Sequence, residues 1–188
     1  MAIDSGEFRI TQVAGKIWSV GTAFGEVYVY CYVIDTDDGL ILYDCGLKKT
    51  ATAIFDLCKQ LGRGPEDIRV VVLSHSHHDH IGALSAIAEA AAATTIAHKR
   101  AEPWLIDHER QYRELFGRWE AYLPLGPAFS DFFFDNLGRP WIPDRLLDTF
   151  PAQVERLASA TIIETPGHSS DSVSLWMEYL GLLICGDA

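Results

Sequence analysis

The hydrophobic and polar positions of the N-terminal part form short segments that predict β-strands. Residues 8–44 include IWSV, VYVYCYVI and LILYD, which are rich in β-branched and aromatic side chains. Glycines interrupt these segments, and the sequence DDG at 37–39 is typical of a hairpin turn. This part of the chain therefore predicts several strands joined by tight turns.

A different spacing begins at residue 51. Apolar side chains at 54, 57, 58 and 61 predict an amphipathic helix over 51–61, which glycines and a proline end. The short, nearly continuous apolar run at 69–73 is typical of a strand buried on both faces. An alanine-rich helix is expected up to residue 93, followed by a strand at 94–97. Alternating strands and helices predict a layered α/β protein.

Aromatic side chains gather in the segment 101–144. Their recurrence every three or four positions predicts a helix over 101–122, whereas prolines and glycines indicate irregular structure at 123–144. Ten of the chain's 21 aromatic residues lie between 101 and 141, about twice the share that length alone would give. We therefore expect an aromatic-rich helical and irregular insertion that forms an apolar lid or pocket wall. A surface helix or a dimer interface is the alternative.

The last part of the chain predicts strands at 161–164, 172–178 and 182–185. Since domains average roughly 150 residues, the 188 residues indicate one domain over 1–188, with 101–144 as an insertion within it.

Charge and cysteine usage exclude several function classes. The net charge of −11 disfavours a nucleic-acid partner. Four widely spaced cysteines without a CxxC pair indicate neither a disulfide framework nor a cysteine zinc site. The N-terminus has no basic stretch followed by an apolar run, and no apolar segment approaches 18 residues. These features predict a cytoplasmic protein without a membrane partner.

The strongest chemical signal is a cluster of metal-ligand residue types directly after the strand at 69–73. His75, His77, Asp79 and His80 lie within six residues. Imidazole and carboxylate groups bind borderline divalent metals, and a loop leaving a strand can aim all four at one place. Four such groups indicate two metal ions. We expect His78 to point away from the others and to be no ligand.

Four sequence blocks together resemble the metallo-β-lactamase superfamily. They are LILYDCG at 40–46, SHSHHDHIG at 74–82, TPGHSSDSVSL at 165–175 and CGDA at 185–188. The resemblance implies an α/β fold, the four-layer αββα sandwich. It also implies that Asp44 orients groups of the metal loop. The implied ligands are His75, His77 and His168 for one metal, Asp79 and His80 for the second, and Asp187 as a bridge between them.

The resemblance stops at the C-terminal end. The superfamily supplies a further histidine, and the last strand and helix of the sandwich, from a segment beyond the aspartate that corresponds to Asp187. We therefore expect the C-terminal portion of the fold to be incomplete here, with the chain being a fragment or being completed by a partner.

The predicted function follows from this chemistry. Two divalent metal ions, with zinc as the default and iron or manganese as alternatives, would activate a metal-bound hydroxide. Asp79 is the candidate catalytic residue that orients this nucleophile or carries its proton. The aromatic segment and the lack of clustered Lys or Arg favour a small-molecule substrate that is an ester, thioester or lactone. The alternative is a non-catalytic metal-binding remnant of the same superfamily, and a homo-oligomer stays open.

Overall fold

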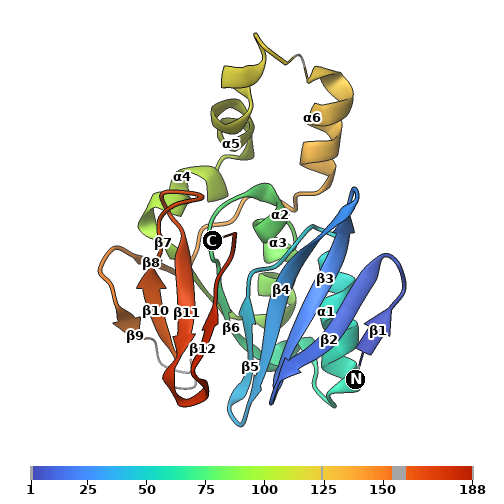
Figure 1. The fold of residues 1–188 in the computed structure, drawn as a ribbon, viewed down its shortest axis with the longest axis vertical. Helices are drawn as coiled ribbons and strands as arrows, with labels where there is room; N and C mark the ends of the chain where they lie inside the picture. Colours follow the sequence, from blue (N-terminus) through green and yellow to red (C-terminus); the bar gives the residue numbers. More distant parts are fainter. Residues whose placement is uncertain (1, 124, 154–159, 188) are drawn as a thin grey trace.

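The computed structural model describes residues 2–123, 125–153 and 160–187, which form two β-sheets packed against each other (Figure 1). The larger sheet has eight strands in chain order: β1 (Ala2–Asp4), β2 (Phe8–Ala14), β3 (Ile17–Phe24), β4 (Val27–Thr36), β5 (Gly39–Tyr43), β6 (Ile68–Val72), β7 (Thr94–His98) and β8 (Arg145–Leu147). The smaller sheet is antiparallel, in the order β12 (Leu182–Ile184), β11 (Val173–Met177), β10 (Thr161–Glu164) and β9 (Ala152–Gln153).

Strand direction in the larger sheet brings several loops to one edge. β1 to β5 pair antiparallel, whereas β5, β6, β7 and β8 pair parallel. Parallel strands end at the same edge of a sheet, which is where α/β proteins place their ligand sites. Asp44, directly after β5, and His75, shortly after β6, therefore lie close together.

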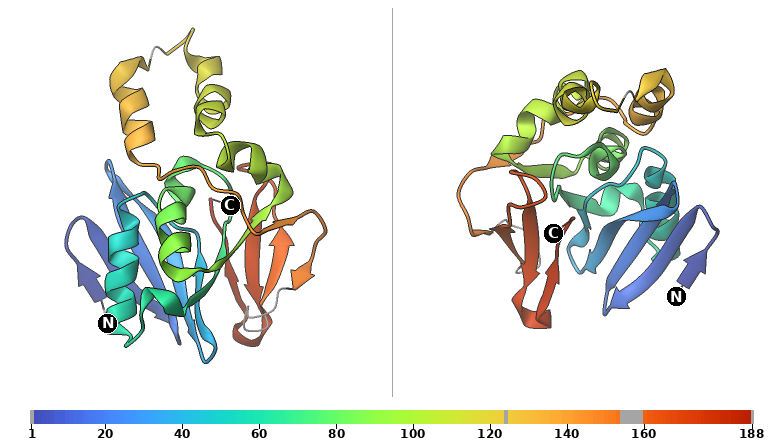
Figure 2. Two further views of the ribbon diagram at one scale, coloured as in Figure 1. Left: turned by 180° about the vertical axis from the view of Figure 1, so that it is seen from behind. Right: turned by 45° about the horizontal axis from the view of Figure 1, so that its top comes forward.

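Helices α1 (Thr50–Gln60) and α3 (Leu84–Ala91) cover the outer face of the larger sheet (Figure 2). Strand β5 shows how the sequence builds both cores. Leu40 and Leu42 pack toward the helices, whereas Ile41 and Tyr43 pack toward the smaller sheet. Because successive side chains of a strand point to opposite faces, a strand buried on both sides needs a continuous apolar run.

The smaller sheet packs its inner face on the larger one through a second apolar core. Leu175 and Met177 of β11 are fully buried in this core, whereas Trp176 between them lies on the outer face beside the 45% exposed Leu183. The expected α/β architecture is therefore confirmed, and the described residues supply one helix layer and both sheets of the αββα sandwich.

Residues 102–123 and 125–135 belong to a helical arm that projects beyond the sheets (Figure 1). It contains α4 (Glu102–Leu105), α5 (His108–Leu115) and α6 (Gly126–Asp135). The predicted helix over 101–122 is interrupted, because the side chain of Asp107 accepts a hydrogen bond from the Arg110 amide and starts a new helix. The prediction of irregular structure over 123–144 is wrong for α6, since Pro127 lies in its first turn, where proline is tolerated.

The remaining helical elements are short. A single turn, α2 (His78–Ile81), follows β6, and four 3-10 turns are η1 (Pro65–Asp67), η2 (Lys99–Ala101), η3 (Gly117–Trp119) and η4 (Glu178–Leu180). Within the described ranges, none of the helices combines the length and apolar character that a membrane crossing requires.

Candidate metal centre

Loops at the carboxyl ends of three strands bring the predicted site residues together. The metal loop, residues 74–80, follows β6, His168 follows β10, and Asp187 follows β12. The backbone at Gly186 passes close to the metal loop, since a side-chain carbon there would lie 2.5 Å from Ser74 Oγ. Glycine at this position therefore allows Asp187 to reach the metal loop.

His75, His77 and His168 form the first group. One ring nitrogen of each lies within 4.8 Å of the others, and His168 Nε2 lies 2.9 Å from His77 Nδ1. The ring centroids are 4.5 Å apart for His75 and His77 and 5.0 Å apart for His75 and His168. Three imidazoles in this arrangement offer the nitrogen donors of one metal ion.

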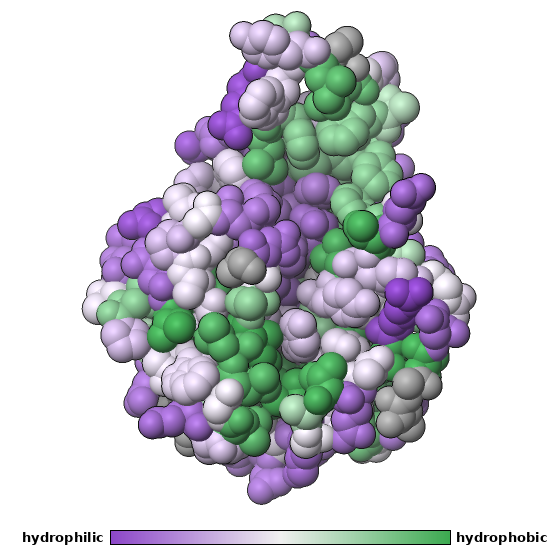
Figure 3. Space-filling model, viewed as in Figure 1, coloured by the Kyte–Doolittle hydropathy of each residue, from purple (hydrophilic) through white to green (hydrophobic). Residues whose placement is uncertain are grey.

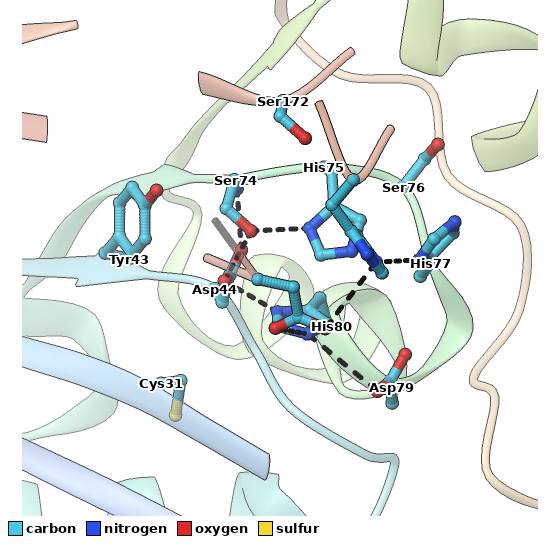
Figure 4. Close-up of polar contacts among 12 residues, drawn as sticks. Cys31, Tyr43, Asp44, Ser74, His75, Ser76, His77, Asp79, His80 and Ser172 are labelled. Atoms are coloured by element: carbon cyan, nitrogen blue, oxygen red, sulfur yellow. Dashed lines mark hydrogen bonds and ion pairs between the residues drawn. The ribbon is translucent and has the colours of Figure 1, made fainter. Parts of the chain in front are cut away.

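His80 and Asp187 form a second group with His75. Asp187 Oδ1 lies 3.1 Å from His80 Nε2, and Asp187 Oδ2 lies 3.6 Å from His168 Nε2. Asp187 therefore faces both groups. Asp79 Oδ2 lies 3.8 Å from His80 Nε2, at the margin of the second group (Figure 4).

The Asp44 carboxylate is hydrogen-bonded to the first residue of the metal loop. Its Oδ1 accepts a hydrogen bond from the Ser74 amide at 2.6 Å, and its Oδ2 accepts one from Ser74 Oγ at 2.7 Å. The same Oδ2 lies 2.8 Å from His80 Nδ1, and Ser74 Oγ lies 2.8 Å from His75 Nδ1 (Figure 4). Such contacts set the orientation of an imidazole and leave its other nitrogen for a metal.

The buried ring nitrogens of the histidines show whether these residues fit a metal ion. Among the described residues, Nε2 of His75 is buried without a hydrogen-bond partner, whereas Nε2 of His80 lies against the Asp187 carboxylate. Burying a polar atom unpaired is unfavourable, so the unpaired His75 nitrogen close to the Asp187 carboxylate indicates a missing positive partner. Nitrogen and oxygen donors of this kind suit zinc, iron or manganese. The residues present therefore fit a divalent metal ion.

Burial and neighbouring charges set the protonation of these groups. Burial, with the nearby histidines, lowers the pKa of His75 to about 2, and burial, with His168 beside it, lowers the pKa of His77 to about 4. Burial also disfavours the charged form of His80, but Asp44 and Asp187 outweigh it and raise its pKa to about 10. A hydrogen bond with His80 lowers the pKa of Asp187 to about 2. His75 and His77 are therefore neutral at pH 7.

Two buried polar side chains that were not among the predicted site residues also hold the metal loop. Asp171 Oδ2 accepts hydrogen bonds from the Ser76 amide at 2.9 Å and from Ser76 Oγ at 2.7 Å. On the other side, Gln111 of α5 donates from Nε2 to the Ser76 carbonyl. The available signal for Gln111 was a polar residue on the apolar face of the helix, three residues after His108 and four before Leu115.

His78 lies outside both groups. Its ring centroid is 4.6 Å from that of Phe133 and 5.8 Å from that of Phe24. Phe24 in turn stacks on Phe132 at 5.3 Å. The aromatic segment therefore contacts both the metal loop and the β3–β4 hairpin, and apolar side chains gather over α6 at the top of Figure 3.

A cavity of about 350 Å³ opens beside the second group. Alternate residues of β4, Tyr28, Tyr30 and Tyr32, form a tyrosine strip along one wall. The cavity lining also includes Asp79, His80 and Asp187. A small molecule can therefore lie on aromatic rings with one end at the histidine cluster.

A His/Asp cluster that fits a divalent metal ion lies at one edge of the two packed sheets, which defines an α/β protein with a candidate metal centre. The family model of the metallo-beta-lactamase superfamily matches residues 24–188, and the chain belongs to this superfamily.

Several curated relatives are similar to the chain. The uncharacterized protein YobT of Bacillus subtilis is 26% identical over 185 residues, which cover 96% of this chain and 70% of that protein. An N-acyl homoserine lactonase of a Bacillus species is 25% identical over a match that covers 81% of this chain and 59% of the lactonase. The probable metallo-hydrolase YflN of Bacillus subtilis is 28% identical, with 79% and 54% covered.

Solved structures agree with the fold. A metallo-beta-lactamase with a HARLDQ motif from Cronobacter sakazakii has a TM-score of 0.65 and 26% identity, and covers 88% of this chain and 58% of that one. The subclass B3 metallo-beta-lactamase BJP-1 of Bradyrhizobium japonicum has a TM-score of 0.62 and 28% identity, with 88% and 55% covered. The chain thus spans little more than half the length of these enzymes.

Proposed function

We propose that the chain carries the metal site of a hydrolase with two metal ions that cleaves a lactone or another small carboxylic ester or thioester. The observation that carries this proposal is the position of Asp187, whose two oxygens face His80 and His168 in the two groups. A carboxylate between two sets of imidazoles is suited to hold two divalent cations close together.

Each group has a defined part in this proposal. His75 Nε2, His77 Nδ1 and His168 Nε2 would hold one ion, and His80 Nε2 with Asp79 would hold the other, with Asp187 shared. When bound, such ions lower the pKa of a coordinated water to near 7 and polarise a carbonyl oxygen. Asp79, whose carboxylate lines the cavity, would orient the attacking water and carry its proton to the leaving group.

The cavity wall supports the substrate class. The tyrosine strip offers apolar ring faces beside the cluster, while the cavity lining has no lysine or arginine within the described residues. This combination favours an uncharged ester with an apolar acyl part over a phosphate ester. Similarity to N-acyl homoserine lactonases points to lactones within that class.

The test combines metal content with turnover. The chain is loaded with zinc, iron or manganese, its metal content is measured by plasma mass spectrometry, and hydrolysis of N-acyl lactones, thioesters and β-lactams is followed with a pH indicator. About two equivalents of metal with lactone turnover support the proposal. Bound metal without turnover of any substrate contradicts it and supports the alternative, a non-catalytic metal-binding remnant. The His168→Ala variant is the control for activity that depends on the first group.

A further inference from the structure

The helical arm contacts the metal loop through buried polar and aromatic side chains as well as apolar ones. Gln111 is completely buried, although α5 is otherwise rich in exposed polar residues. Its Nε2 donates to the Ser76 carbonyl, and its Oε1 has no hydrogen-bond partner among the described residues. An apolar residue would avoid this unpaired oxygen, so packing alone does not explain a glutamine here.

Ser76 is the residue between two of the proposed ligands, His75 and His77. Asp171 accepts from its amide and hydroxyl groups, and Gln111 donates to its carbonyl. The peptide planes on both sides of Ser76 are therefore each held by a hydrogen bond to a side chain. Since each plane leads into a ligand residue, rotation of either would redirect an imidazole.

Trp104 of α4, which also belongs to the helical arm, contacts the ring of His77. The two rings stack with their centroids 5.8 Å apart and their planes 22° apart. Trp104 Nε1 donates to Glu114 Oε2 at 2.6 Å, and Glu114 Oε1 accepts from Arg110 Nε at 2.7 Å. Helix α5 thus holds Trp104 in place through Glu114 and also contributes Gln111, so the arm fixes both the backbone and the ring of this ligand segment.

We propose that Gln111 is a positioning residue for the first metal group: its hydrogen bond to Ser76 keeps His75 and His77 aimed at His168. The arm is then a structural part of the metal site, in addition to any role as a lid. This inference rests on the proposed metal-binding function, and it predicts properties of the metal-free chain as well.

The test replaces Gln111 by methionine, which has a similar volume and no donor. The matched control is Arg113→Met, at an exposed position of the same helix. We expect Gln111→Met to weaken zinc binding by the first group about 10- to 100-fold, as loss of groups that orient ligands typically does, while the control is unchanged. The visible spectrum of the cobalt-loaded variant should also change, because the ligand geometry is altered.

A second readout uses the metal-free chain. Hydrogen exchange should become faster at the Ser76 amide, which donates to Asp171, in Gln111→Met and stay at the wild-type rate in Arg113→Met. Wild-type zinc affinity, cobalt spectrum and exchange in Gln111→Met would overturn the inference. If this variant does not fold, Gln111→Leu replaces it, since leucine also cannot donate to the Ser76 carbonyl. Weakened zinc binding in a chain that hydrolyses no substrate would uphold the inference and contradict the proposed hydrolase.

Discussion

Asp44 Oδ2 lies 2.8 Å from His80 Nδ1, and both side chains are almost completely buried. The Asp44 backbone has a φ of +64°, a conformation that a residue other than glycine seldom adopts. The chain thus accepts an unfavourable backbone conformation at the point where β5 ends and this carboxylate meets the metal loop.

The Asp44→Asn variant should lose most of the second metal ion. An amide in place of the carboxylate removes the negative charge beside the His80 ring. It also removes one of the two oxygens that accept hydrogen bonds from Ser74. We expect affinity for the second equivalent of zinc to fall about 10- to 100-fold, with a smaller effect on the first. Zinc titration against a competing chelator measures both steps.

Asp35→Asn is the matched control for this variant, because Asp35 pairs with Arg63 at 2.9 Å and lines no part of the cavity described above. Equal second-site affinity in Asp44→Asn and the wild type would show that His80 needs no carboxylate partner.

The Asp79→Asn variant tests the proposed catalytic role. Asp79 is about 17% exposed and faces the cavity, so its carboxylate can reach a bound substrate. We expect kcat for a lactone to fall about 10²- to 10⁴-fold, the range typical of losing a positioned proton carrier. Metal content is measured on the same sample. A variant with full metal content and full activity would refute the role.

Much of this site could be predicted from the sequence because its donors are local. The metal loop places four donor residues within six positions, and the apolar run of β6 indicates where the loop begins. The Asp44 motif likewise marks the end of β5. Patterns of this kind indicate directly where a strand ends and which metal-donor side chains follow it. They therefore also predict which donor side chains lie close together.

The arm could not be predicted in the same way. Helix α6 forms in a segment whose prolines and glycine indicated irregular structure, because Phe133 is completely buried against Tyr112 and Phe134. Such packing depends on contacts far apart in the sequence, which override local propensity. The contact between Gln111 and Ser76 spans 35 residues, and only the folded chain shows it.

The tyrosine strip predicts how the protein selects substrates. Tyr30 is 39% exposed and lines the cavity, with its ring over Gly21, where a side-chain carbon would lie 2.6 Å from the ring. In Tyr30→Ser, we expect KM to rise most for lactones with long acyl chains, by about 4-fold for each methylene that loses its contact. A series of acyl-chain lengths measures this slope. Tyr179→Ser is the control, since Tyr179 is 59% exposed and lies in η4, outside the cavity. The same slope in both variants would place the acyl chain elsewhere.

The metal-free chain should be most stable near pH 6.5. The low pKa values of His75 and His77, caused mainly by burial, mean that the unfolded state takes up protons first as pH falls below about 6.5. The free energy of unfolding therefore decreases on acidification. The pKa of His80 is raised to about 10, so its contribution is complete below about pH 6.5 and is lost as pH rises toward 10.

Urea unfolding at a series of pH values, with chelator present, measures both sides of this profile. His80→Gln should flatten the alkaline side, whereas His77→Asn should flatten the acid side. An alkaline decrease of wild-type steepness in His80→Gln would mean that other groups cause it. Because Asp44 is the chief source of the raised pKa, Asp44→Asn should flatten the alkaline side as His80→Gln does, and this agreement would tie the pH profile to the contact between these two residues.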